Sequence, residues 1–95
     1  MIVEDLRIEL EKIISALLSS GFTNIDSGIT EKLEKLAVTA GEMEMTEGKR
    51  LIINLASVIK SIQDGKSGAE SGSVRLTALD FYVKKLAGGG NIEDL

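Results

Sequence analysis

The fold is decided by residues 47–63, which read EGKRLIINLASVIKSIQ. Apolar residues recur there every three or four positions, the spacing that places them on one face of an α-helix. Leu51-Ile52-Ile53 is the most strand-like patch of the chain, but it lies inside this continuous helical period. We therefore predict a helix over 47–63 that Thr46 caps. Its inward stripe comprises Gly48, Leu51, Ile52, Leu55, Ile59 and Ile62.

Gly48 belongs to that stripe, although glycine destabilises a helix interior by about 1 kcal/mol relative to alanine. It precedes Leu51 and Ile52 by three and four positions, so all three residues share one face. A missing side chain on an inward face lets another helix approach closely. We predict that Gly48 is a packing residue.

Three further segments have the same helical spacing of apolar residues, at 3–20, 28–44 and 74–87. Gly21 follows the first segment and is expected to close it as a left-handed cap. Gly41 lies inside the second, where we expect it to be a tolerated weak point. Three residues could cap the second helix: Asp26, Ser27 or Thr30.

The four segments predict an all-α fold, a single-domain antiparallel bundle over residues 1–87. Residues 64–73 are rich in glycine and serine and are expected to form a flexible internal linker. Residues 88–95 are expected to form a disordered tail. The predicted core comprises Leu6, Leu10, Ile13, Leu17, Leu33, Leu36, Leu51, Leu55, Ile59, Leu79, Val83 and Leu86.

The composition of the 95-residue chain excludes several classes of function. The sequence contains no Cys, His, Trp or Pro, which removes zinc fingers and thiolate or imidazole nucleophiles. Fifteen acidic against eleven basic residues leave a net charge of −4, which argues against a nucleic-acid partner. No apolar run is long enough to cross a membrane, and the first residues lack a signal-peptide pattern. We expect a cytoplasmic protein.

Three polar patterns could carry chemistry, and none is convincing. Gly65-Lys66-Ser67 matches the end of a phosphate-binding loop, but the required earlier glycine is replaced by Lys60, and a helix precedes the motif. Acidic residues at helical spacing, such as Glu31 and Glu34, lie off the apolar stripes. The basic residues of the second half, such as Arg75, are expected to balance surface charge. We predict no catalytic residue, no bound cofactor and no metal site.

The chain from Ile13 to Leu86 resembles the helical region that accompanies SWIM zinc-finger domains in bacterial proteins. Three stretches carry the resemblance: Leu17-Leu18 with Gly21-Phe22, then residues 31–37 (EKLEKLA), then residues 48–56 (GKRLIINLA). The Cys and His ligands of the zinc finger are absent, so neither a metal nor a DNA role is implied. The resemblance implies a helical scaffold or partner-binding module that acts beside other subunits.

These observations favour a non-catalytic, helical protein–protein interaction or scaffold module. The alternatives are a small-ligand-binding bundle or carboxylate-based enzyme and, second, a nucleic-acid accessory factor. Asn54 lies at the edge of an apolar face, where it could fix an interface or be exposed to solvent. We expect a protein partner or a homodimer, because several apolar residues lie at the flanks of their helices. These residues are Ile14, Leu18, Val38, Ile53, Val58 and Phe81.

Overall fold

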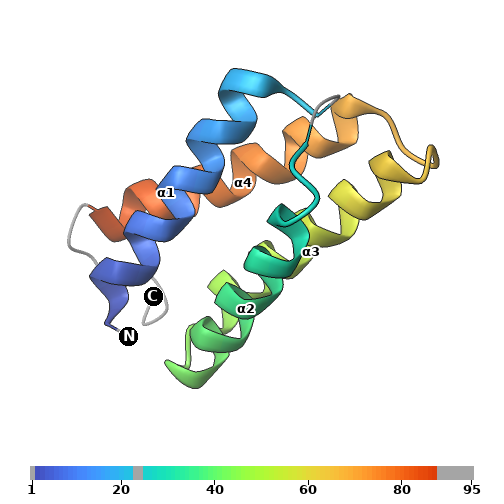
Figure 1. Ribbon diagram of the computed structural model, residues 1–95. Coiled ribbons are helices and arrows are strands. Elements are labelled where there is room, and N and C mark those ends of the chain that lie inside the picture. Colours follow the sequence, from blue (N-terminus) through green and yellow to red (C-terminus); the bar gives the residue numbers. More distant parts are fainter. Residues whose placement is uncertain (1, 23–24, 88–95) are drawn as a thin grey trace.

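The computed structural model describes residues 2–22 and 25–87, and over these residues the chain forms four helices and no strand. The helices are α1 (Val3–Ser20), α2 (Ile29–Glu42), α3 (Thr46–Gln63) and α4 (Ala69–Ala87). Successive helices run in opposite directions, with α2 beside α3, α3 beside α4, and α4 beside α1 (Figure 1). The predicted all-α, antiparallel four-helix architecture is confirmed.

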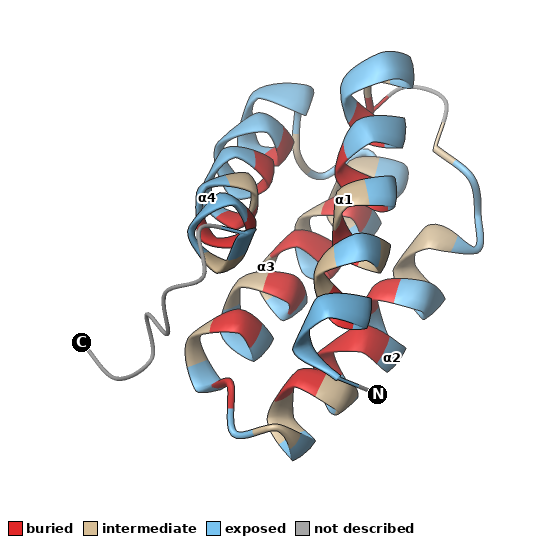
Figure 2. Ribbon diagram, turned by 90° about the vertical axis from the view of Figure 1, so that its left-hand side faces the viewer, coloured by how far each residue is buried: buried red, intermediate tan, exposed pale blue. Residues whose placement is uncertain are grey.

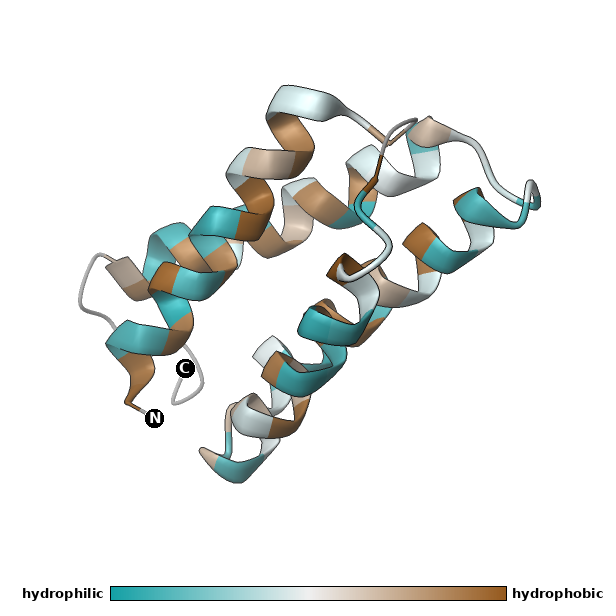
Figure 3. Ribbon diagram, in the orientation of Figure 1, coloured by the Kyte–Doolittle hydropathy of each residue, from teal (hydrophilic) through white to brown (hydrophobic). Residues whose placement is uncertain are grey.

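The helices pack through their apolar stripes. Apolar residues recur along all four helices (Figure 3), and the buried ones follow the side of each helix that faces the others (Figure 2). Ten of the residues predicted for the core are buried, whereas Leu51 and Leu86 are half-buried and pack against it. The predicted core omits nine further buried residues, on the helices and in the loops: Ile14, Phe22, Ala37, Ala40, Met45, Ile52, Ala56, Leu76 and Tyr82.

The predicted boundary of the last helix is wrong. α4 begins at Ala69 rather than Val74, so residues 69–73 of the predicted linker 64–73 belong to the helix. Glycine and serine are poor helix formers, but tertiary packing overrides that preference here, because Gly72 is buried against its neighbours. The connection between α3 and α4 is therefore only 64–68. The predicted tail, 88–95, lies outside the described residues.

The connection between α1 and α2 is closed at its two ends by local hydrogen bonds. Gly21 ends α1 with φ +71°, and its N–H donates to the Leu17 carbonyl at 2.8 Å. The φ of the predicted left-handed cap is confirmed, but ψ is −169°, so the residue is extended rather than left-handed helical. Gly28 precedes α2 as its N-cap residue, and no side chain caps the helix. Asp26, one of the three predicted caps, instead accepts a hydrogen bond from the Gly28 N–H at 2.9 Å.

The turn between α2 and α3 shortens the predicted second helix and lengthens the third by one residue. α2 passes through Gly41, as expected, but ends at Glu42 because Glu44 adopts a left-handed conformation with φ +61°. The Met45 N–H donates to the Ala40 carbonyl at 2.9 Å, and the Glu44 N–H to the Gly41 carbonyl at 3.1 Å. Helix α3 includes Thr46 as its first residue, and no side chain caps it. This tight turn holds α2 and α3 together as an antiparallel pair.

Candidate functional site

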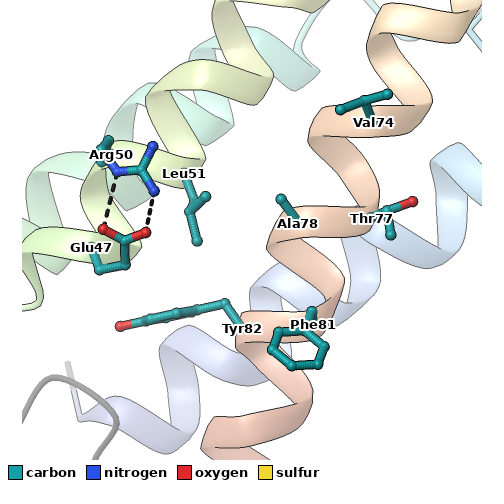
Figure 4. A pocket seen from close by; sticks show the side chains of 8 residues that line it. All are labelled: Glu47, Arg50, Leu51, Val74, Thr77, Ala78, Phe81 and Tyr82. Atoms are coloured by element: carbon teal, nitrogen blue, oxygen red, sulfur yellow. Dashed lines mark hydrogen bonds and ion pairs between the residues drawn. The ribbon is translucent and has the colours of Figure 1, made fainter. Parts of the chain in front are cut away.

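An open apolar groove runs between α3 and α4 (Figure 4). Its volume is about 580 Å³, within the range of known ligand pockets and of grooves that accept a partner's side chains. Both helices supply its walls, and polar side chains occupy one rim. The lining residues are Glu47, Arg50, Leu51, Val74, Thr77, Ala78, Phe81 and Tyr82.

The end of the groove nearest the start of α3 is closed by Gly48 and Tyr82. A Cβ atom on Gly48 would lie 2.9 Å from the Tyr82 Oη atom and 3.0 Å from its Cε1 atom, too close for a side chain to fit without movement. Both residues are buried, with Tyr82 only 3% exposed. The prediction that Gly48 allows a close helix approach is confirmed. The Tyr82 hydroxyl lies against the backbone of α3 at Gly48.

A second glycine sets the approach of the same two helices at their other end. A Cβ on Gly72 would lie 2.8 Å from the Cε1 and Cζ atoms of Phe22 and 2.9 Å from Cδ1 of Ile62. Sequence reasoning missed this contact because it placed Gly72 in a linker. Gly48 and Gly72 therefore bring α3 and α4 together at opposite ends of their contact.

The wall on the α4 side is apolar and open to solvent. Val74 and Phe81 are each 63% exposed, and Ala78 between them is also exposed. These three residues are separated by four and three positions, so they form one stripe along α4. Leu51 faces this stripe from α3 and is half-buried (Figure 4). The groove thus exposes an aromatic ring and two aliphatic side chains beside a packed core.

Charged side chains line the edges of the groove. The Arg50 guanidinium donates two hydrogen bonds to the Glu47 carboxylate, one of them from Nε to Oε2 at 3.0 Å. These bonds hold the pKa of Glu47 below its ordinary value and raise the pKa of Arg50. On α4, the Lys85 ammonium lies 4.9 Å from the centroid of the Phe81 ring, a cation–π contact. The Glu47–Arg50 pair and Lys85 thus lie at the edges of the groove, beside its apolar lining.

The other flank residues expected to remain exposed do not gather in one place. Leu18 on α1 and Val38 on α2 are 68% and 61% exposed, but they lie on different helices and neither lines the groove between α3 and α4. Ile14 is buried and Val58 is half-buried, so the expectation that they contribute to an exposed patch is wrong. Ile53 is 45% exposed beside the half-buried Asn54, in a second hollow on the outer side of α3.

Val74 and Ala78 were not predicted as members of a surface patch, although their spacing carried a signal. The last helix was predicted to begin at Val74, so no residue of a preceding helical turn could be assigned to the same face. Extending α4 back to Ala69 brings Val74, Ala78 and Phe81 into a continuous stripe. A helix with apolar residues on two faces has a weakly amphipathic sequence pattern. The outer apolar stripe of α4 is therefore hard to recognise from the sequence.

The polar patterns considered from the sequence lie on the surface. Lys35 pairs with Glu31 at 3.5 Å, and Glu34 pairs with Lys60 of the neighbouring helix. Over the described residues, no group of three or more acidic residues is placed to hold a metal ion.

The Gly65-Lys66-Ser67 motif forms the turn after α3. The Ser67 hydroxyl lies 2.8 Å from that of Ser61. α4 begins two residues after this motif, so the predicted linker is shorter than expected. The preceding helix still differs from the strand that a phosphate-binding loop requires.

Comparison with known proteins gives no match: no family model fits the chain, and no curated protein or solved structure matches it. The resemblance to the helical region of SWIM-containing proteins therefore stays a prediction. None of the four helices in the described part of the chain has the length and apolar character that a membrane span requires.

Proposed function

We propose that this protein is a cytoplasmic, non-catalytic interaction module that binds another protein chain through the groove between α3 and α4. One observation carries the proposal: Val74 and Phe81 are 63% exposed on a helix whose opposite face places Leu76, Leu79 and Val83 in the core. Single exposed aliphatic residues are common on monomers, but several along one groove are typical of interfaces.

The composition of the groove fits a protein partner. Aromatic residues that stand beside a small pocket contribute strongly to binding energy when a partner covers them. Phe81 has this position, and Leu51 and Ala78 offer an apolar surface next to it. The Glu47–Arg50 pair and Lys85 provide the polar rim that surrounds apolar contacts in most interfaces.

The charges of the chain favour a protein over a nucleic acid as partner. Three of the cations on α3 and α4, Arg50, Lys60 and Lys84, are paired with carboxylates, which lowers the positive potential that phosphates require. The proposed module would act beside other subunits, as the resemblance to the SWIM-associated region of bacterial proteins implies.

The proposal is tested by affinity capture from the native cell with three tagged forms of the chain. These are the wild type, Phe81→Asp, and the matched control Val38→Asp, whose side chain is almost equally exposed on α2. We expect a stoichiometric protein, either a second copy or a different chain, to be retained by the wild type and by Val38→Asp and to be lost with Phe81→Asp. Equal retention by all three forms, or no stoichiometric protein with any of them, would contradict the proposal.

A further inference from the structure

We propose that the outer face of α4 pairs with the same face of a second copy of this chain, in an antiparallel contact with two-fold symmetry. This inference rests on the proposed function and names its partner. The surface involved is the outer stripe of α4, which we define as Glu70, Val74, Ala78, Phe81 and Lys85. All five residues are exposed, and their spacing of four, four, three and four places them on one side of the helix.

The order of residues along this stripe is complementary to its own reverse. An acid begins the stripe and a base ends it, while Val74 and Phe81 lie symmetrically between them. Glu70 precedes Val74 by four positions, and Lys85 follows Phe81 by four positions. An antiparallel register that brings Val74 to the partner's Phe81 therefore also brings Glu70 to the partner's Lys85.

Two-fold symmetry repeats each of these contacts. The pairing would contain two Val–Phe contacts and two Glu–Lys ion pairs along about 22 Å of helix, at 1.5 Å per residue. Such isologous contacts, in which one patch meets itself, are the commonest basis of protein dimers. A parallel arrangement would instead place Glu70 against Glu70 and Lys85 against Lys85.

The centre of the stripe and the adjoining groove have room for the second copy. In the antiparallel register the small residues Thr77 and Ala78 lie at the two-fold axis, where they allow the helices to approach. The groove opens beside Ala78, between Val74 and Leu51 (Figure 4). The partner's Phe81, which the register brings to Val74, has space there for its ring.

The charges at the two ends of the stripe are available for such a contact. Neither Glu70 nor Lys85 belongs to any of the ion pairs formed between described residues, whereas Lys84 and Asp80 on the adjacent side are paired at 2.9 Å. Lys85 lies over its own Phe81 ring and can reach a carboxylate beyond it without leaving the stripe.

The first test is the molar mass measured by light scattering during size-exclusion chromatography, over a wide concentration range. We expect the molar mass of the wild type to rise with concentration from the 10.2 kDa of the monomer toward twice that value, and the molar mass of Val38→Asp to rise in the same way. Phe81→Asp should stay a monomer, with circular dichroism showing that it keeps its helices. A wild type that stays monomeric up to its solubility limit, or a Phe81→Asp variant that still dimerises, would overturn the pairing.

Charge reversal tests the antiparallel register. Glu70→Lys or Lys85→Glu alone would place like charges opposite each other at both ends, and each should weaken the dimer about 3- to 10-fold, since exposed ion pairs contribute modestly. The double variant Glu70→Lys/Lys85→Glu restores both attractions and should dimerise as the wild type does. A double variant weaker than either single variant would contradict the antiparallel register.

The two proposals can fail separately. A monomeric wild type that nevertheless retains a different chain in a Phe81-dependent manner would overturn the pairing and leave the proposed function intact. A monomeric wild type with no Phe81-dependent protein would overturn both.

Discussion

The two long faces of α4 are both apolar, yet only one of them is covered. The inner face places Leu76, Leu79 and Val83 in the core, where each is at most 4% exposed. The outer face carries Val74 and Phe81 at 63% exposure. The fold of one chain accounts for the burial of the inner face, whereas Val74 and Phe81 on the outer face stay mostly exposed in that fold. The difference separates residues that stabilise the monomer from residues that we assign to association.

The largest effect on stability is expected for a substitution at the inner face of α4. Leu79 is completely buried, so Leu79→Ala removes apolar contacts and leaves a cavity. We expect the free energy of unfolding to fall by about 2–5 kcal/mol, as for other buried leucines. Urea denaturation followed by circular dichroism measures this change. A loss below that of a surface substitution would show that the inner face does not support the fold.

A smaller but clear loss is expected where α4 approaches Phe22 and Ile62. In Gly72→Ala the new methyl group meets side chains on two sides at 2.8–2.9 Å, so we expect a loss of about 1–3 kcal/mol from overpacking. Gly68→Ala is the matched control, because no atom lies within 4 Å of its Cβ position. If both variants have the same midpoint of denaturation, the close approach at Gly72 is refuted.

Because Gly48 contacts Tyr82, we expect Gly48→Ala to lower the stability of the fold, whereas helix propensity alone predicts an increase. Alanine is a better helix former than glycine by about 1 kcal/mol, but in Gly48→Ala its methyl group would displace the buried Tyr82 ring. We expect a net loss of about 1 kcal/mol. Gly41→Ala, where the three nearest atoms belong to the exposed and flexible Lys49 side chain, should instead gain up to about 1 kcal/mol of stability. A rise in melting temperature for both variants would contradict close packing at Gly48.

The outer face predicts the smallest effect on the monomer. Phe81→Ser removes an exposed ring that contacts the Lys85 ammonium of the same chain. We expect the free energy of unfolding of the dissociated chain to change by no more than about 0.5 kcal/mol. Melting at low protein concentration measures this value. Because a dimer is stabilised by mass action, the wild-type melting temperature should rise with concentration and that of Phe81→Ser should not. A large loss in the dilute chain would assign Phe81 to the fold rather than to association.

Helical periodicity predicted the four helices, their antiparallel order and most of the core from the sequence. It could do so because an aliphatic stripe at 3.6-residue spacing has few other ways to leave water. Gly48 was predictable for a related reason: glycine in the middle of an inward stripe needs a neighbour that fills its place. The start of α4 was not predictable, because Gly72 and Ser73 disfavour a helix locally, whereas Gly72 packs against Phe22 and Ile62, which are distant in sequence.

The groove could be predicted only in part. Phe81 stood out as a flank residue, but the fate of each flank depends on how the helices turn against one another, which local spacing does not determine. Ile14 and Phe81 have similar positions beside their stripes, yet the first is buried and the second is exposed. Val74 joined the surface only once the true start of α4 was known.

The central claim is that the outer stripe of α4 is the surface through which the chain associates. It is tested most directly by amide chemical shifts of the isotope-labelled protein, recorded at increasing concentration. We predict that the amide signals of Glu70, Val74, Ala78, Phe81 and Lys85 change together with concentration, while those of Leu18 and Val38 stay constant. Constant signals along α4, or changes centred on Leu18 or Val38 instead, would contradict the claim.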